Sequence, residues 1–127
     1  MNKTLLLIGA VFGLLTVLLG AFGAHAFHSE LVSNGRLDTY QTAVRYQEFH
    51  AVALLVLGIL AKRIHTKYLK YSGYLIAVGT VFFSGSLYLL SLLNLSAFGA
   101  IAPIGGTLLI AGWACLVVAI FKYDANK

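Results

Sequence analysis

Charged residues are scarce in this chain of 127 residues. Asp, Glu, Lys and Arg together make up 10% of the sequence, and hydrophobic residues make up 60%. A soluble domain carries roughly a quarter of its residues charged. A soluble fold of this composition would need several helices that are apolar on all sides, in a chain too short to cover them. The lack of charge therefore excludes most soluble classes.

Cysteine and catalytic patterns are also nearly absent. The single cysteine, Cys115, lies within an apolar run, so neither a disulfide nor a cysteine metal framework can form within the chain. We interpret it as a small buried hydrophobic residue. The sequence contains no nucleotide-binding loop, Ser-His-Asp arrangement or paired-carboxylate pattern, so it predicts no enzyme, no cofactor and no metal.

Apolar runs, in contrast, are abundant. A hydrocarbon layer of about 30 Å needs roughly 20 apolar residues of helix, and four stretches come near that length, at residues 5–24, 42–61, 71–93 and 103–121. The first run exceeds the roughly 7–15 residues of a signal-peptide core, so we interpret it as a retained helix. The sequence predicts an all-α integral membrane protein of four transmembrane helices, forming a single domain over residues 1–127 in the inner or plasma membrane.

Basic residues are distributed unequally between the two sides of this predicted membrane. Seven of the nine Lys and Arg residues share a side with the termini, and only Arg36 and Arg45 lie on the other. The positive-inside rule then places both termini in the cytoplasm. We expect the connection Lys62–Lys70 to contact anionic lipids. Lipid contact explains the net charge of +5 better than binding to nucleic acid, so we expect no nucleic-acid partner. The seven basic residues are Lys3, Lys62, Arg63, Lys67, Lys70, Lys122 and Lys127.

The longest outer segment reads as the start of a helix. Asn34 and Gly35 mark a break, after which an apolar stripe and a polar stripe each follow helical spacing. The apolar stripe contains Leu37, Tyr40 and Val44, and the polar stripe contains Asp38, Gln41, Arg45 and Glu48. The pattern predicts an amphipathic helix that begins on the outer membrane surface and continues into the second span.

Small residues follow helical spacing within the apolar runs. Such stripes let helix backbones approach closely in lipid, and a proline fits the first turn of the fourth helix. The faces of helices one and four are too extensive to be buried easily in a thin bundle, so we also expect a homo-oligomer or a membrane-protein partner. The candidate packing residues are Gly9, Gly13, Gly20, Gly23, Gly73, Pro103, Gly105, Gly106 and Gly112.

Four sequence blocks resemble a known family. They are the GAFGAH block ending at His25, the TAVRYQEFHA block from Thr42 to Ala51, the FSGSLY block from Phe83 to Tyr88, and Pro103-Ile-Gly-Gly106 followed by Gly112-Trp113. In this order they resemble the bacterial membrane proteins of domain of unknown function 423, whose eukaryotic relative is transmembrane protein 256. The resemblance implies a four-helix inner-membrane protein with no established activity. Ala102 stands where the family often has Thr, which removes a possible capping side chain.

The predicted topology brings all four blocks to the outer leaflet, where their polar side chains form a candidate site. Three interpretations remain open. Arg45 and Glu48 form an ion pair while His50 bonds to a neighbouring helix; the cluster forms a polar pocket that binds a ligand; or His25, His50 and Glu48 bind a metal, although their spacing is no metal motif. The candidate residues are His25, Arg45, Tyr46, Glu48, His50, Ser84, Ser86 and Tyr88.

Two classes of function follow from these observations. In the first, the protein is a non-enzymatic structural or interaction component that supports membrane or envelope homeostasis. In the second, an oligomer transports protons, an ion or a small solute and uses the outer-leaflet His/Glu cluster as its binding or relay group.

Overall fold

The protein is built of helices that run nearly the whole length of the chain. The structure, a computed structural model, describes residues 1–125. Four of its helices are long and apolar enough to cross a membrane, which confirms the predicted all-α fold with four spans. The helices are α1 (Lys3–Ala24), α2 (His28–Ser33), α3 (Leu37–Leu60), α4 (Lys67–Leu93), the 3-10 helix η1 (Ser96–Ala100) and α5 (Ala102–Phe121).

The second long helix confirms that the amphipathic segment and the second span are continuous. α3 begins at Leu37 and runs without a break to Leu60. The chain reaches it through Gly35, whose positive φ of 68° is a conformation that glycine adopts without strain. The sequence did not predict the short helix α2, which occupies the connection between α1 and α3.

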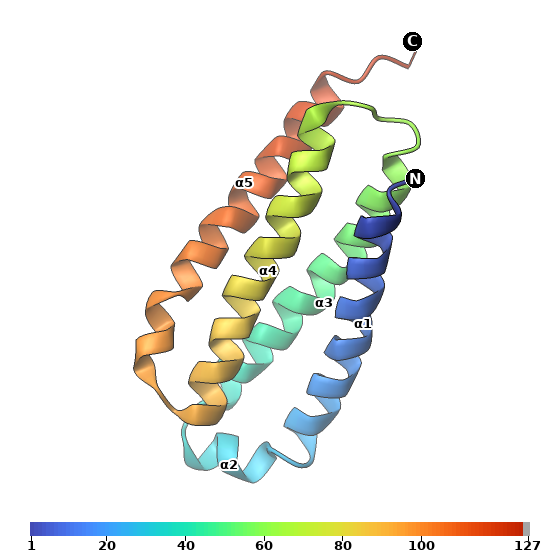
Figure 1. The fold of residues 1–127 in the computed structure, drawn as a ribbon. Coiled ribbons are helices and arrows are strands. Elements are labelled where there is room, and N and C mark those ends of the chain that lie inside the picture. Colours follow the sequence, from blue (N-terminus) through green and yellow to red (C-terminus); the bar gives the residue numbers. More distant parts are fainter. Residues whose placement is uncertain (126–127) are drawn as a thin grey trace.

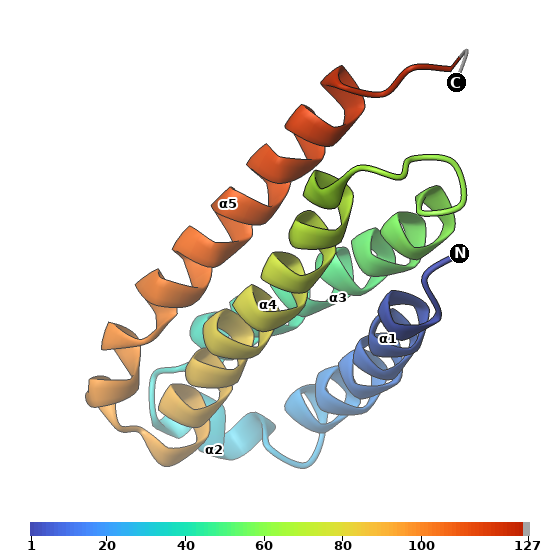
Figure 2. The same cartoon turned by 45° about the horizontal axis from the view of Figure 1, so that its top comes forward.

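The long helices form an open row. α1 packs mainly on α3, α3 on α4, and α4 on α5. In both views α1 and α5 lie at opposite edges, with α3 and α4 between them (Figures 1 and 2). Because the row does not close into a compact bundle, one broad surface on α3 and much of α5 remain uncovered within the chain.

The two ends of the row differ in charge. The N-terminus, the end of α5 and the connection between α3 and α4 lie at one end, which we call the terminal end, while α2 and η1 lie at the other (Figure 1). The terminal end therefore carries six of the seven basic residues assigned to one side, and Lys127 lies outside the described residues. The arrangement agrees with an even number of spans, and the cytoplasmic location of this end stays a prediction.

Most of the predicted packing glycines are at helix contacts. A Cβ atom at Gly9 would lie 2.9 Å from the carbonyl oxygen of Ala51, and one at Gly23 would overlap the ring of Tyr40, so both glycines let α1 approach α3. A Cβ atom at Gly73 would overlap Leu5. Glycine thus permits close contacts that a methyl group would prevent.

The contact between α4 and α5 depends on glycine most directly. A Cβ atom at Gly105 would overlap the backbone of Phe83, and one at Gly112 would lie 2.7 Å from Ile76. Gly79 of α4, which the sequence did not single out, has the same role, since a Cβ atom added there would lie 3.0 Å from Leu109.

Four of the predicted packing positions behave differently. A Cβ atom added at Gly13 would meet nothing within 4 Å, and one at Gly20 or Gly106 would make only ordinary van der Waals contacts. Pro103 is exposed and lies one residue inside the start of α5 at Ala102, where its missing N–H is harmless. These positions therefore lie outside the tightest helix contacts.

Candidate functional site

The first polar connection joins three helices. The hydroxyl group of Tyr88 in α4 donates to Oε1 of Gln47 in α3, at 2.6 Å. The amide nitrogen of Gln47 in turn donates to the carbonyl oxygen of Phe12 in α1, at 3.0 Å. Gln47 is only 5% exposed. These bonds satisfy one donor and one acceptor of a buried amide, so the chain Tyr88–Gln47–Phe12 ties α4 to α1 through α3.

Sequence reasoning missed Gln47, although a signal was present. The buried face of α3 contains Tyr40, Ala43, Gln47, His50 and Leu54, at spacings of three and four residues. Gln47 is thus in register with the apolar stripe of its own helix. A polar side chain at a position that the periodicity assigns to the core is a candidate for an interhelical hydrogen bond.

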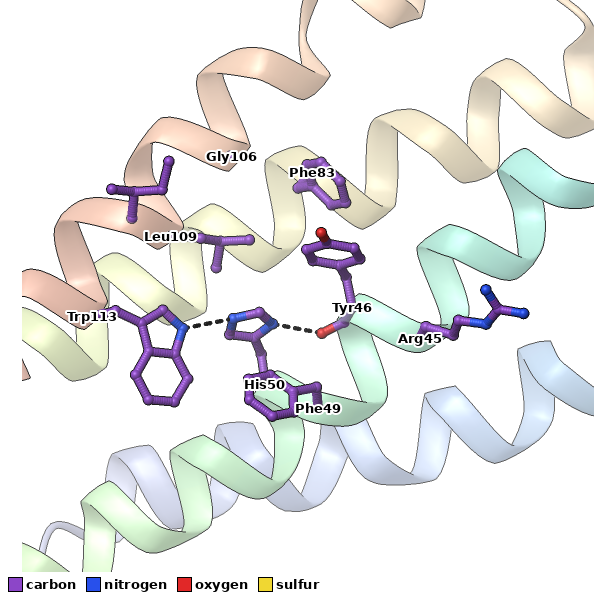
Figure 3. A pocket seen from close by; sticks show the side chains of 9 residues that line it. Arg45, Tyr46, Phe49, His50, Phe83, Gly106, Leu109 and Trp113 are labelled. Atoms are coloured by element: carbon purple, nitrogen blue, oxygen red, sulfur yellow. Dashed lines mark hydrogen bonds between the residues drawn. The ribbon is translucent and has the colours of Figure 1, made fainter.

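The second polar connection centres on His50, which is 3% exposed. The indole nitrogen of Trp113 in α5 lies 3.0 Å from Nε2 of His50, and Nδ1 of His50 lies 2.6 Å from the carbonyl oxygen of Tyr46 (Figure 3). Indole can only donate, so Nε2 accepts and Nδ1 carries the hydrogen that is donated to Tyr46. The imidazole is therefore neutral in this arrangement, and both of its nitrogens are occupied.

This bond also joins two helices that are not adjacent in the row. The backbones of α3 and α5 are separated by α4, and the long side chains of His50 and Trp113 bridge the distance. Phe49 packs beside them, with its ring centre 5.6 Å from that of Trp113. His50 thus bonds to another helix, as one interpretation predicted, although that helix is not adjacent to α3 in the row.

The two candidate serines hydrogen-bond to backbone carbonyl groups. Oγ of Ser84 donates to the carbonyl oxygen of Ala43 at 2.8 Å, which links α4 to α3. Oγ of Ser86 donates to the carbonyl oxygen of Phe83 in its own helix at 2.9 Å. Both serines are buried, and each uses its one hydroxyl hydrogen in these bonds.

Other members of the candidate site do not join these connections through their side chains. His25 is exposed just beyond the end of α1, and Arg45, Tyr46 and Glu48 are exposed on α3. In residues 1–125 no ion pair joins Arg45 to Glu48, in contrast to the predicted pairing. Figure 3 shows Arg45 extending away from the pair of His50 and Trp113. Both side chains are exposed and form no ion pair over residues 1–125, so the structure does not contain the predicted pair within one chain.

The structure also separates the proposed metal ligands. Over the described part of the chain, no three His, Cys, Asp or Glu side chains come close enough to hold a metal ion. His25 lies at the end of α1, whereas His50 is buried farther along α3 and bonded to Trp113. The interpretation that joined His25, His50 and Glu48 in a metal site has no geometric support.

Shallow cavities lie on both sides of the row. One of about 460 Å³ lies between α3 and α5, and its wall is mostly aromatic and aliphatic (Figure 3). Ser84 and Tyr88 line a different and smaller cavity of about 190 Å³, between α1 and α4. The predicted polar pocket is thus divided between two faces of the protein. The larger cavity is lined by Arg45, Tyr46, Phe49, His50, Phe83, Gly106, Leu109, Ile110 and Trp113.

Comparison with known proteins finds one matching family model and several similar membrane proteins. The family model described as protein of unknown function DUF423 matches residues 19–106. UPF0382 membrane protein YwdK of Bacillus subtilis is 40% identical over 95% of this chain and 98% of its own length. UPF0382 inner membrane protein YgdD of Escherichia coli K12 is 36% identical, over 95% of this chain and 92% of its own.

A UPF0382 membrane protein of Staphylococcus haemolyticus is 39% identical over 95% of this chain and 98% of its own length. No solved structure matches the chain significantly. The family model covers more than half of the chain, the relatives match almost end to end, and four helices can span a membrane. The chain is therefore a multi-pass membrane protein that belongs to the DUF423 family.

Proposed function

We propose that this protein is a non-enzymatic structural component of the membrane, which supports membrane or envelope homeostasis through lateral contact with other membrane-embedded proteins. The observation that carries the proposal is the use of the buried polar side chains. Tyr88, Gln47, Ser84 and His50 spend their hydrogen bonds on connections between helices. A substrate site needs polar atoms that point into a cavity, and these point at neighbouring helices.

The surface of the protein supports the same proposal. Aliphatic and aromatic side chains remain uncovered along α1, α3 and α5, and the row leaves α1 and α5 as free edges. A protein that acts by lateral contact needs such a surface, whereas a carrier needs an enclosed path. Four helices in an open row enclose little space between them.

The alternative is transport of protons, an ion or a small solute by an oligomer. One observation favours it: Glu48 is an exposed carboxylate close to the middle of α3. Ionisable residues at such depth commonly mark ion or proton paths. A path formed between subunits could use this carboxylate even though a single chain encloses no channel.

A flux measurement separates the two classes. The purified protein is reconstituted into liposomes that contain a pH-sensitive dye, and a potassium gradient with valinomycin supplies the driving force. We expect proton entry at the rate of protein-free liposomes. Entry that exceeds this rate and disappears in Glu48→Gln would overturn the structural proposal and establish the alternative.

A cross-linking measurement tests the positive part of the proposal. A photoreactive residue is placed in cells at Val52, which is 59% exposed on α3, and at the buried Leu54 of the same helix as a control. We expect protein adducts of defined mass at position 52 and none at position 54. If position 52 forms no protein adduct, lateral contact through α3 is excluded.

A further inference from the structure

The starting observation is the position of Glu48. It is the twelfth of the 24 residues of α3, so at a rise of 1.5 Å per residue it lies about 17 Å from each end of the helix. Its neighbour Gln47 bonds to Phe12, which is near the middle of α1. Glu48 is exposed and borders a shallow groove lined by apolar residues, among them Val52 and Val56. A single chain therefore holds an exposed carboxylate near the middle of a helix long enough to span the membrane.

An ionisable group at this depth normally faces protein or water and has a partner, because exposure to hydrocarbon is costly. Over residues 1–125, the carboxylate of Glu48 forms no hydrogen bond and no ion pair. Within the described residues, Glu48 therefore lacks the partner that such a group normally has.

A cation lies on the same surface. Arg45 is exposed one helical turn from Glu48 and, within the described residues, its guanidinium group forms neither a hydrogen bond nor an ion pair. Arg36, nearer the end, is bonded to Asn94 and Ser96. Arg45 and Glu48 are the only charged residues in the interior of the four predicted spans, and their charges are opposite.

We propose that the occupant of this surface is a second copy of the chain, bound through α3 so that Arg45 of each copy pairs with Glu48 of the other. The proposal deepens the proposed function by naming a partner for lateral contact. A two-fold axis along the membrane normal places the two α3 helices in parallel and at equal depth. Arg45 and Glu48 of opposite copies are then offset by three residues, about 4.5 Å along the axis, a distance that the long arginine side chain covers.

The same contact covers apolar residues between the charged pair and the C-terminal end of α3. Phe49, Val52, Val56 and Ile59 follow along the exposed side of α3, and each is 48% to 59% exposed in the single chain. Their spacing of three and four residues suits packing of one helix on its copy. Two ion pairs would thus form among apolar side chains, where a charge without its partner would be strongly destabilising.

Charge complementarity favours a second copy over a lipid. The surface carries one positive and one negative charge, so its own copy matches it completely. An anionic headgroup would satisfy Arg45 and be repelled by Glu48, and acyl chains satisfy neither. The sequence predicted an oligomer from the glycine faces of the first and fourth spans. Several of these glycines, among them Gly9, Gly105 and Gly112, contact other helices of the same chain. We therefore place the interface between copies on α3 instead.

Matched charge-removing variants test the ion pairs. Arg45→Gln and Glu48→Gln are co-expressed with different tags, each with Cys115→Ser and Val52→Cys, and a disulfide is formed in the membrane before solubilisation. Only the mixed dimer retains an Arg45–Glu48 pair. We therefore expect mixed dimers to exceed their statistical share by about threefold or more, as interhelical polar interactions in membranes allow. Two tagged copies that are otherwise wild type should mix statistically.

The controls separate this inference from the proposed function. Val17→Cys, on the exposed side of α1, should cross-link far less than Val52→Cys. A statistical share in the mixed variants would overturn the reciprocal pairs, because a pair within one chain gives mixed dimers no advantage. A monomer in nanodiscs, without a Val52 disulfide, would overturn the dimer. Adducts of position 52 with a different protein would overturn the second copy and leave the proposed function standing.

Discussion

At the scale of single residues, the buried hydroxyl groups of α4 differ in whether they form a hydrogen bond. Ser84 donates across the contact of α4 and α3, and Thr80 donates to Ile76 within α4. Ser72, which is fully buried in the same helix, has no hydrogen-bond partner for its Oγ among the described residues. A buried hydroxyl without a partner lowers stability, whereas one that links two helices raises it.

The two serines predict opposite effects of the same substitution. Ser72→Ala removes an unsatisfied group and should raise the free energy of unfolding by about 1 kcal/mol. Ser84→Ala removes an interhelical bond and should lower it by about 0.5–1.5 kcal/mol. Unfolding in mixed micelles of mild detergent and SDS measures both. A loss of stability in Ser72→Ala would mean that its hydroxyl has a partner in the membrane.

At the scale of helices, close approach depends on where glycine lies, not on how many glycines a helix contains. Gly105 lies against the backbone of Phe83, so α5 cannot keep its position if a side chain is added there. Gly13 is also a glycine in an apolar helix, but a Cβ atom added there would meet nothing within 4 Å. The row of helices explains the difference, because one side of α1 has no neighbour within the chain.

A matched pair of alanine substitutions tests this explanation. Gly105→Ala should lower the free energy of unfolding by about 1–3 kcal/mol, because backbone atoms of Phe83 cannot yield as a flexible side chain can. Gly13→Ala should leave stability unchanged or raise it by up to about 1 kcal/mol, from the higher helix propensity of alanine. The same micelle titration measures both. If Gly13→Ala were the more harmful variant, Gly13 would belong to an interface between proteins.

At the scale of the whole molecule, the asymmetry of basic residues is the main determinant of orientation. Lys3, Lys62, Arg63, Lys67, Lys70 and Lys122 gather at the terminal end, and the opposite end carries α2 with Glu30 and the start of α3 with Asp38. We propose that the terminal end faces the cytoplasm, in accordance with the positive-inside rule.

Cysteine labelling tests the orientation. In a Cys115→Ser background, single cysteines replace Lys67 at the terminal end and Ser33 at the α2 end, both of which are exposed. In intact cells an impermeant thiol reagent should label position 33 and spare position 67, and permeabilisation should expose both. Labelling of position 67 alone in intact cells would reverse the orientation.

The terminal end also predicts a preference for anionic lipid. Lys62, Arg63, Lys67 and Lys70 are all exposed in or beside one short connection. Each basic residue near an anionic surface contributes about 1 kcal/mol, so the melting temperature should be higher in nanodiscs with anionic lipid than in zwitterionic ones. Replacement of all four residues by Gln should abolish most of this difference. An unchanged difference in the variant would place the lipid effect elsewhere.

The class of this protein and its number of spans could be predicted from hydropathy. Hydropathy and helix length act locally, so four apolar runs predict four helices whatever they pack against. The continuity of α3 from Leu37 could be predicted for the same reason, since two stripes at helical spacing need only one helix. The types of residue in the candidate site were also evident, because buried His, Tyr and Ser stand out in apolar runs.

Which of these side chains contact each other could not be predicted, because it depends on how the helices pack. His50 bonds to Trp113, and Tyr88 bonds to Gln47, because the order α1, α3, α4, α5 of the row sets which helix faces lie opposite each other. Arg45 and Glu48 were predicted to pair from their spacing, yet both are exposed and form no ion pair over residues 1–125. Hydrogen bonds between helices depend on rotation and neighbour choice, and these follow from the packing of whole helices, which no local pattern encodes.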